Sequence, residues 1–196
     1  MIQQVVLASS NPGKLKEFQQ LLAGVGFEVL PQSHFQVTDA EETGLSFVEN
    51  AILKARNACL ATGLPALADD SGIEVDYLNG QPGIYSARYS GTQATNESNN
   101  AKLLEALKGV PSENRGARYQ CVLVFMRHSE DPTPLICQGS WEGSILEAPA
   151  GDGGFGYDPL FFVPEHNCAA AELSKDEKGR ISHRAKALKA LLAQLQ

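Results

Sequence analysis

Strand-like apolar runs alternate with helix-periodic segments along this chain, and this order constrains its fold more than any other feature. The first unit is an apolar run from Ile2 to Ala8, a small polar loop, and a predicted helix from Pro12 to about Leu22. Asn11 is expected to cap this helix, because an Asn side chain at that position accepts a hydrogen bond from a free backbone N–H. Two glycines end the helix, and a second strand is predicted from Phe27.

The same alternation continues along the rest of the chain. A capping box formed by Ser46 and Glu49 predicts a helix to about Thr62, and Thr95 is the expected cap of a helix over residues 96–108. Strands are predicted at residues 64–68, 73–77, 119–127 and 135–145, and a last helix is predicted from about Ser182. The strand at residues 64–68 is expected to stop at the acidic pair that follows it. This order predicts an α/β fold around a mixed sheet, with two lobes and a cleft as one form of it.

Length and composition describe an ordinary globular chain. With 196 residues and 21.0 kDa, it is long enough for one domain with a core, or for two small lobes. It has no apolar stretch near the roughly 20 residues of a membrane span, and no secretory signal is expected at its amino terminus. The four cysteines form neither a zinc pattern nor a disulfide framework, so a reduced, cytoplasmic setting is expected.

The net charge of −7 argues against a protein that binds nucleic acid regardless of its sequence, because such binding needs Lys and Arg against the phosphates. The charge is also uneven along the chain. Residues 1–171 carry 10 basic and 20 acidic side chains, whereas residues 172–196 carry six basic and three acidic ones. The basic end could form a helix with a solvated face, or the cationic part of an anion site whose other part binds metal. Composition does not decide between the solvated helix and the anion site.

The first candidate site is the small polar loop Ser9–Lys14, which ends at a predicted helix start. Free backbone N–H groups at a helix N-terminus attract anions, and Lys14 adds a positive charge beside them. The loop lacks the spacing of glycines, lysine and hydroxyl that defines a Walker A motif. The sequence therefore indicates either a phosphate-binding loop or an ordinary capped helix start with a solvated lysine.

The second candidate site is the acidic pair Asp69 and Asp70 at the end of an apolar run. Carboxylates at a strand end of an α/β fold can hold Mg²⁺, and one of them can take a proton from a water molecule. Neighbouring side chains in a strand point to opposite faces, so at most one is expected to face the attacking water. Glu41 or Glu42, ahead of the second helix, could add a carboxylate. The alternative is a common turn rich in Asp, Ser and Gly.

The third candidate site is a glycine-rich loop with Phe155, Tyr157 and Asp158, taken together with Lys178 and Ser182–Arg184. Phe155 stands among four glycines, so an exposed stacking face is expected. His183 and Arg184 fall in the first turn of the last helix, where cations oppose the helix macrodipole, and this indicates an anion or an electron-rich base edge as their partner. The alternative is a solvated helix start that pairs with a nearby carboxylate.

These three sites together are what binding of a Mg²⁺–nucleoside triphosphate requires. Six motifs carry a resemblance to a known family, and they are Ser10–Lys14, Glu49–Ala51, Ala68–Gly72, Pro82–Arg88, Gly154–Pro159 and Ser182–Arg184. In this order, over most of its length, the chain resembles the inosine triphosphate pyrophosphatase family, the bacterial dITP/XTP pyrophosphatases. One departure is the pair Ser9 and Ser10, where many relatives have Thr and Gly.

The resemblance implies an α/β fold with a long central mixed sheet, flanking helices and two lobes with an intervening substrate cleft. Residues 1–196 would form one such domain. It also implies Mg²⁺-dependent hydrolysis of ITP, dITP and XTP to the monophosphate and pyrophosphate, which removes deaminated purines from the nucleotide pool. A cytoplasmic homodimer is implied, with residues 82–88 as our prediction for part of the contact, and neither nucleic acid nor a membrane is implied as a partner.

The resemblance also assigns roles to residues by motif. Asp70 is implied as the general base, and Glu41, Asp69 and Asp70 as the carboxylates near the metal. The loop implied to hold the triphosphate consists of Ser9, Ser10, Asn11, Pro12, Gly13 and Lys14, and Lys54 is implied as a further phosphate contact. The remaining implied substrate contacts are Ser71 and the nucleoside-binding set Phe155, Gly156, Tyr157, Asp158, Lys178, His183 and Arg184.

Two other functions fit parts of the sequence. Maf-like nucleotide pyrophosphatases typically show Ser-Pro-Arg-Arg where this chain has Asn11–Lys14, which counts against them. A nucleotide-binding sensor without turnover would not need the intact pair Asp69 and Asp70. Release of pyrophosphate from ITP with Mg²⁺ would separate an enzyme from a sensor.

Overall fold

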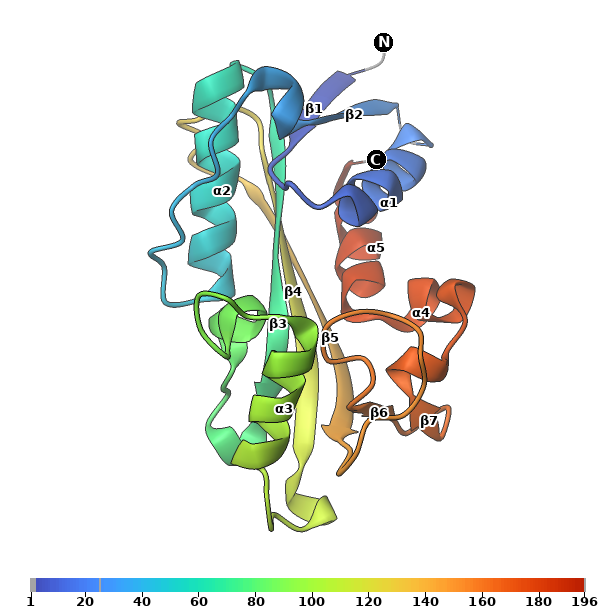
Figure 1. Cartoon of the computed structure of the whole chain (residues 1–196). Coiled ribbons are helices and arrows are strands. Elements are labelled where there is room, and N and C mark those ends of the chain that lie inside the picture. Colours follow the sequence, from blue (N-terminus) through green and yellow to red (C-terminus); the bar gives the residue numbers. More distant parts are fainter. Residues whose placement is uncertain (1–2, 25, 196) are drawn as a thin grey trace. The chain divides into compact units, whose positions relative to one another are not determined.

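The structure, a computed structural model, describes residues 3–24 and 26–195 (Figure 1). Within helix α1 (Pro12–Ala23), only the backbone is described at Pro12, Gly13, Glu17, Gln20, Leu21 and Ala23. Ile2, the first residue of the predicted opening strand, also lies outside the described residues. The described residues form two compact units: unit 1 consists of those up to Asp70, Cys121–Gln138 and those from Ala187, and unit 2 of Ser71–Gln120 and Gly139–Lys186.

The described residues form a seven-stranded sheet in the order β2-β1-β3-β4-β5-β6-β7. The strands are β1 (Gln3–Leu7), β2 (Phe27–Pro31), β3 (Ala66–Val75), β4 (Gly116–Met126), β5 (Leu135–Ile145), β6 (Phe161–Val163) and β7 (Cys168–Ala169). β1 pairs in parallel with β2 and β3, whereas β6 pairs antiparallel with β5 and β7. The sheet is therefore mixed, and the predicted α/β class is confirmed.

The strand β3 differs from its prediction. The sequence predicts a strand that stops at Asp69, and this is wrong, because β3 continues through Asp69 and Asp70 to Val75. Both aspartates are buried, and each pairs with a lysine: Asp69 with Lys14, and Asp70 with Lys54. These counter-charges offset the cost that normally keeps carboxylates out of a buried strand. The acidic pair therefore lies inside a strand, which excludes the alternative of a surface turn.

The other helices are α2 (Phe47–Thr62), α3 (Asn96–Ala106), α4 (Lys175–Ile181) and α5 (His183–Leu195), with short 3₁₀ helices at Gln32–Phe35, Asp76–Leu78, Gly83–Arg88, Ser112–Asn114 and Ala170–Glu172. The side chains of Ser46 and Thr95 each accept a hydrogen bond from the third residue of the helix that follows, so both predicted caps are confirmed. The sequence prediction lacks α4, although the capping box of Ser174 and Glu177 ahead of it was a usable signal.

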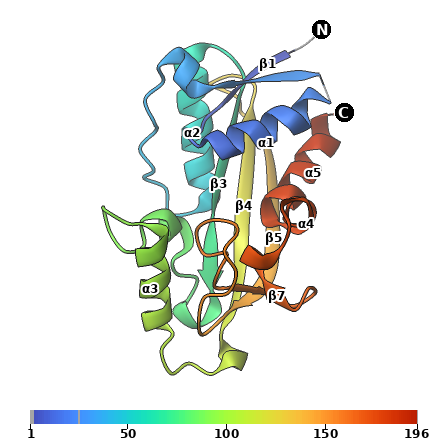
Figure 2. The same cartoon turned by 45° about the vertical axis from the view of Figure 1, so that its right-hand side comes forward.

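Each unit has its own hydrophobic core. In unit 1, α1 packs against β2 (Figure 2), and Leu7, Phe18 and Leu188 are among the buried side chains. The core of unit 2 is richer in aromatic rings and includes Tyr119 from β4 and Trp141 from β5. None of the described helices is long and apolar enough to cross a membrane.

Candidate active site

The loop between β1 and α1 is held in place by its own side chains. Ser9 Oγ accepts a hydrogen bond from the N–H of Asn11 at 3.2 Å, and Asn11 Oδ1 accepts one from the N–H of Lys14 at 3.2 Å. The predicted capping contact of Asn11 is therefore confirmed. Pro12 and Gly13 occupy the first turn of α1, where only their backbone is described. The backbone N–H groups of this helix start form an electropositive end that suits an anion.

Lys14 forms an ion pair with Asp69 in unit 1. The Asp69 side chain is fully buried, whereas that of Lys14 is 19% exposed. The thiol of Cys121 donates to the other carboxylate oxygen, Asp69 Oδ2, at 3.4 Å. A buried carboxylate is costly without a counter-charge. The ammonium group of Lys14 is therefore held next to Asp69, beside the loop. Lys14 is therefore not the solvated surface lysine of the alternative interpretation.

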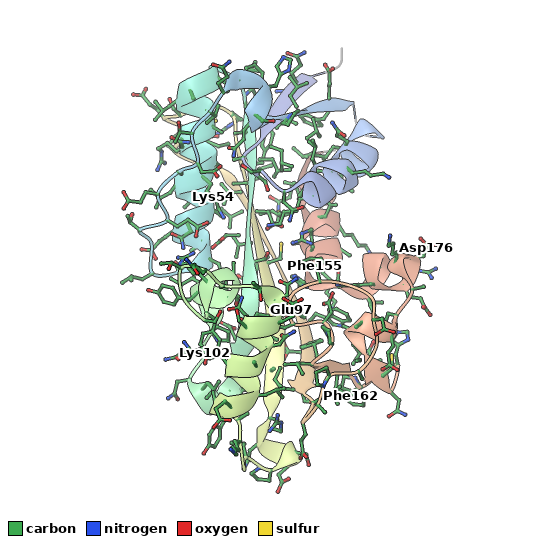
Figure 3. All side chains as sticks on the ribbon, in the orientation of Figure 1. Lys54, Glu97, Lys102, Phe155, Phe162 and Asp176 are labelled. Atoms are coloured by element: carbon green, nitrogen blue, oxygen red, sulfur yellow. The ribbon has the colours of Figure 1, made fainter. Side chains whose placement is uncertain are left out.

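Lys54, which Figure 3 labels on α2, bridges two carboxylates. Its Nζ lies 2.7 Å from Asp70 Oδ1 and 3.1 Å from Glu42 Oε1. Burial alone would lower the pKa of Lys54, but the two carboxylates outweigh this and raise that pKa. Burial raises the pKa of Asp70, against the opposing effect of Lys54. Of the two glutamates before α2, the structure brings Glu42 to this cluster, and the side chain of Glu41 is exposed.

Asp70 keeps one oxygen that fits a metal ion. Asp70 Oδ2 is buried, and no hydrogen-bond donor in the described part of the chain reaches it. Mg²⁺ bound with a nucleotide commonly takes one or two protein carboxylates together with phosphate oxygens. Within residues 3–24 and 26–195, no group of three or more His, Cys, Asp or Glu side chains is placed to hold a metal on its own. Asp70 Oδ2, which accepts no hydrogen bond from the described residues, fits the role of a protein carboxylate ligand to such an ion.

A pocket of about 190 Å³ in unit 1 is lined by several of these side chains and by two that the sequence did not indicate, Gln32 and Asp39. Gln32 Nε2 donates to Ser10 Oγ at 3.1 Å and also to Asp39, and Ser10 Oγ donates to Asp39 Oδ1 at 3.1 Å. Because β1 and β2 are parallel neighbours, with Leu7 opposite Pro31, the residues that follow the two strands meet at one edge of the sheet. Since Gln32 directly follows β2, this parallel pairing is the signal that could have identified it as a neighbour of the loop after β1.

In unit 2, Asp158 holds the glycine-rich loop together. Its Oδ2 accepts hydrogen bonds from the N–H of Phe155 at 2.8 Å and from Lys178, and its Oδ1 accepts one from the hydroxyl of Tyr119 at 3.2 Å. Gly154 has a φ of +73°, and a Cβ there would lie 2.1 Å from Asp158 Oδ2, so the loop needs glycine at this position. Asp158 is 2% exposed, and its contacts place it to orient Phe155 and Lys178.

Phe155 is the exposed member of this cluster, and the partly buried Lys178 lies beside it. The Phe155 ring, labelled in Figure 3, is 58% exposed, as predicted, and Lys178 Nζ lies 4.7 Å from the ring centre. Gly156 has a φ of +63°, and its carbonyl accepts a hydrogen bond from Asn100 Nδ2 at 3.0 Å. Tyr157 is buried, and its hydroxyl donates to a backbone carbonyl at 2.8 Å. Phe155 thus offers a stacking face, whereas the side chain of Tyr157 packs in the core.

His183 and Arg184 begin α5, and both are buried, at 6% and 7% exposed. The His183 ring stacks on that of Tyr119, with centroids 4.7 Å apart and planes 9° apart. Arg184 Nη2 lies 3.4 Å from Ser71 Oγ, so the predicted contacts Ser71 and Arg184 are neighbours. Burial of both side chains excludes the alternative of a solvated helix start.

Known proteins resemble this chain along nearly its whole length. A family model described as the Ham1 family matches residues 5–194. A protein of Escherichia coli strain K12 named dITP/XTP pyrophosphatase is 58% identical over 195 residues, which cover 100% of this chain and 99% of that protein. A protein of the same name from Vibrio parahaemolyticus is 59% identical over 194 residues, covering 99% of this chain and 97% of that protein.

Solved structures show the same similarity. A HAM1 protein from Coxiella burnetii has a TM-score of 0.95 and 51% identity, with 98% of each chain covered. A nucleoside-triphosphatase / dITP/XTP pyrophosphatase from Mycobacterium abscessus has a TM-score of 0.81 and 42% identity, covering 97% of this chain and 99% of that one. The resemblance inferred from the six motifs is therefore confirmed. Since the sequence match and the shared fold both extend over almost every residue, this chain belongs to the Ham1 family.

Proposed function

We propose that this protein hydrolyses the deaminated purine nucleoside triphosphates ITP, dITP and XTP to the monophosphate and pyrophosphate, with Mg²⁺ and in the cytoplasm. One observation carries the proposal: a capped helix start lies in the same unit as the ion pairs Lys14–Asp69 and Lys54–Asp70. Cationic groups suit a polyphosphate, and adjacent carboxylates suit a metal ion and a water molecule. Relatives named dITP/XTP pyrophosphatases support the choice of substrate.

In this proposal, the helix start and two lysines bind the triphosphate. The backbone N–H groups at the start of α1, Lys14 and Lys54 supply positive charge, and the hydroxyls of Ser9 and Ser10 line the pocket beside them. Both lysines are already held by carboxylates, so they need little reordering when the substrate binds. The cationic groups are thereby fixed where negative charge accumulates during the reaction.

Asp70 takes the proton from the water that attacks the α-phosphorus. Lys54 fixes Oδ1, which leaves Oδ2 as the oxygen available to the metal or the water. The water oxygen bonds to the α-phosphorus, the bond between the α- and β-phosphates breaks, and pyrophosphate leaves with its electrons. Asp70, with Asp69 nearby and Glu41 or Glu42 from the loop before α2, would hold Mg²⁺. When bound, Mg²⁺ neutralises charge on the phosphate oxygens.

The cluster in unit 2 binds the nucleoside in this proposal. Phe155 stacks on the purine through its exposed face. Lys178, His183 and Arg184 supply hydrogen-bond donors, and the 6-oxo group of hypoxanthine or xanthine is an acceptor that matches them. Ser71 lies beside Arg184 and adds a hydroxyl.

Release of pyrophosphate from ITP, XTP, GTP and ATP in the presence of Mg²⁺ tests the proposal. We expect hydrolysis of ITP and XTP at rates well above those for GTP and ATP, and loss of activity when a chelator removes the metal. Binding of ITP without release of pyrophosphate would instead identify a nucleotide-binding sensor. A preference for other triphosphates would favour a Maf-like pyrophosphatase.

Replacement of the loop lysine tests the triphosphate assignment. Lys14→Ala is expected to weaken binding of ITP about 10-fold or more, and binding of inosine monophosphate much less, because the lost charge faces the outer phosphates. The melting temperature is also expected to fall, since the buried carboxylate of Asp69 loses its counter-charge. Calorimetry with both ligands measures the effect, and Lys16→Ala, at an exposed position of α1, is the matched control. Equal losses for both ligands would place Lys14 away from the outer phosphates.

We also propose a homodimer, on the basis of the family resemblance. The 3₁₀ helix Gly83–Arg88 carries Tyr85, which is 51% exposed, and the Arg88 guanidinium lies 5.2 Å from its ring centre. Tyr and Arg are enriched at the centres of protein interfaces. Light scattering at micromolar concentration is expected to give the mass of two chains, and Tyr85→Ala to shift the equilibrium towards one. A single-chain mass for the wild-type protein would contradict the homodimer.

A further inference from the structure

We propose that Tyr119 is a positioning residue that orients two separate parts of the nucleoside site in unit 2 and thereby sets how tightly the base is bound. That this site binds a nucleoside, and which nucleobase it takes, rests on the proposed function. Tyr119 lies on β4 and is 8% exposed. Ala117, two residues earlier, is buried on the same side of the strand, whereas Arg118 and Gln120, the two neighbours of Tyr119, are more exposed. Its ring contacts one part of the site and its hydroxyl contacts the other.

The ring of Tyr119 supports His183. The two rings are nearly parallel, with an angle of 9° and centroids 4.7 Å apart. Trp141 extends the same platform, since its ring lies 6.5 Å from His183 at 17° and 6.2 Å from Tyr119 at 23°. The nitrogens of an imidazole form hydrogen bonds in the plane of the ring. A platform that fixes this plane therefore fixes the direction in which His183 can form a hydrogen bond with a base.

The hydroxyl of Tyr119 supports Asp158. It donates to Asp158 Oδ1 at 3.2 Å, while Asp158 Oδ2 accepts from the N–H of Phe155 and from Lys178. Burial raises the pKa of Tyr119 well above its usual range, so the hydroxyl keeps its proton and remains a donor. A buried carboxylate depends on each of its donors. If this donor is lost, Asp158 can shift, and Phe155 and Lys178 shift with it.

The ring and the hydroxyl can be tested separately because phenylalanine keeps the first and lacks the second. Tyr119→Phe is expected to weaken binding of inosine monophosphate by about 5- to 10-fold, as loss of one buried hydrogen bond would. Binding of inorganic triphosphate, which has no base, is expected to stay the same. Calorimetry measures both dissociation constants without any turnover. The matched control is Tyr77→Phe, at a side chain that is 55% exposed, and it should leave both constants unchanged.

A double-mutant cycle tests whether the hydroxyl acts through Asp158. In an Asp158→Ala chain the hydroxyl has no carboxylate to hold, so adding Tyr119→Phe should weaken binding of inosine monophosphate no further. A full additional loss in that background would overturn the proposal. If Asp158→Ala does not fold, the dissociation constants of the single variant Tyr119→Phe still test the proposal.

Two results with the single variant and one with the wild-type chain would also overturn the inference. One is wild-type affinity for inosine monophosphate in Tyr119→Phe, even with a lower melting temperature, because the role is then merely structural. The second is an equal loss of affinity for inorganic triphosphate. The third is a wild-type chain that does not bind inosine monophosphate. Failure of the wild-type chain to hydrolyse ITP would contradict the proposed function and leave these binding results standing.

Discussion

Asp70→Asn is expected to bind ITP nearly as well as the wild-type chain and to lose about 100-fold or more of kcat. Asparagine has the same shape, and its carbonyl oxygen can still accept the hydrogen bond that Lys54 donates to Asp70 Oδ1. An amide cannot take a proton from the attacking water, and its NH₂ group cannot replace the carboxylate oxygen Oδ2 beside a cation. Asp70→Asn is therefore expected to lose the chemical step and to keep the binding of ITP. Steady-state kinetics and calorimetry with ITP separate the two effects.

The control for this change is Asp176→Asn, at an exposed position of α4 labelled in Figure 3. It is expected to keep the kcat of the wild-type chain. Near-full activity of Asp70→Asn with Mg²⁺ would contradict the assignment of Asp70 as the base. A variant that no longer binds ITP would instead assign Asp70 to substrate binding.

Arg184→Ala is expected to lower the preference for ITP over ATP by about 5- to 150-fold in kcat/KM. A guanidinium only donates hydrogen bonds, so it matches the 6-oxo acceptor of hypoxanthine and xanthine. Adenine presents an amino donor at the same place, and two donors that face each other in a buried site cost about 1–3 kcal/mol. Guanine keeps the 6-oxo group, so rejection of GTP needs a second element near its 2-amino group. Rates with ITP, GTP and ATP measure the change.

Phe155→Ala is expected to lower activity without changing the preference between ITP and ATP. The exposed ring would stack on any purine, so its loss should lower activity on ITP and ATP alike and leave their ratio nearly unchanged. Arg180→Ala, at an exposed position of α4, is the control for the loss of an arginine. Equal losses for ITP and ATP in Arg184→Ala would make Arg184 a phosphate ligand, and another residue would then recognise the 6-oxo group.

Local signals predicted much of the fold. The caps at Asn11, Ser46 and Thr95 were predicted because a capping contact joins residues only three positions apart. The strand at residues 135–145 was predicted with the bounds that β5 has. Exposure of Phe155 followed from the glycines around it. In each case the cause lies within one short segment, where a single sequence carries the information.

Contacts between distant segments explain what could not be predicted. The acidic pair looks like the end of a strand because the lysines that neutralise it lie elsewhere in the sequence, with Lys14 and Asp69 55 positions apart. Tyr119 has the pattern of an ordinary core residue, since its contact with Asp158 joins positions 39 apart. The resemblance to a family assigned the site residues, whereas the ion pairs and the stacking that hold them required the structure.

Hydrolysis of ITP in water enriched in heavy oxygen tests the central claim most directly, namely that water attacks the α-phosphorus. Mass spectrometry of both products locates the label. We predict heavy oxygen in inosine monophosphate and none in pyrophosphate, because the new bond between oxygen and phosphorus forms at the α-phosphate. Label in pyrophosphate, or formation of inosine diphosphate and orthophosphate, would contradict this claim.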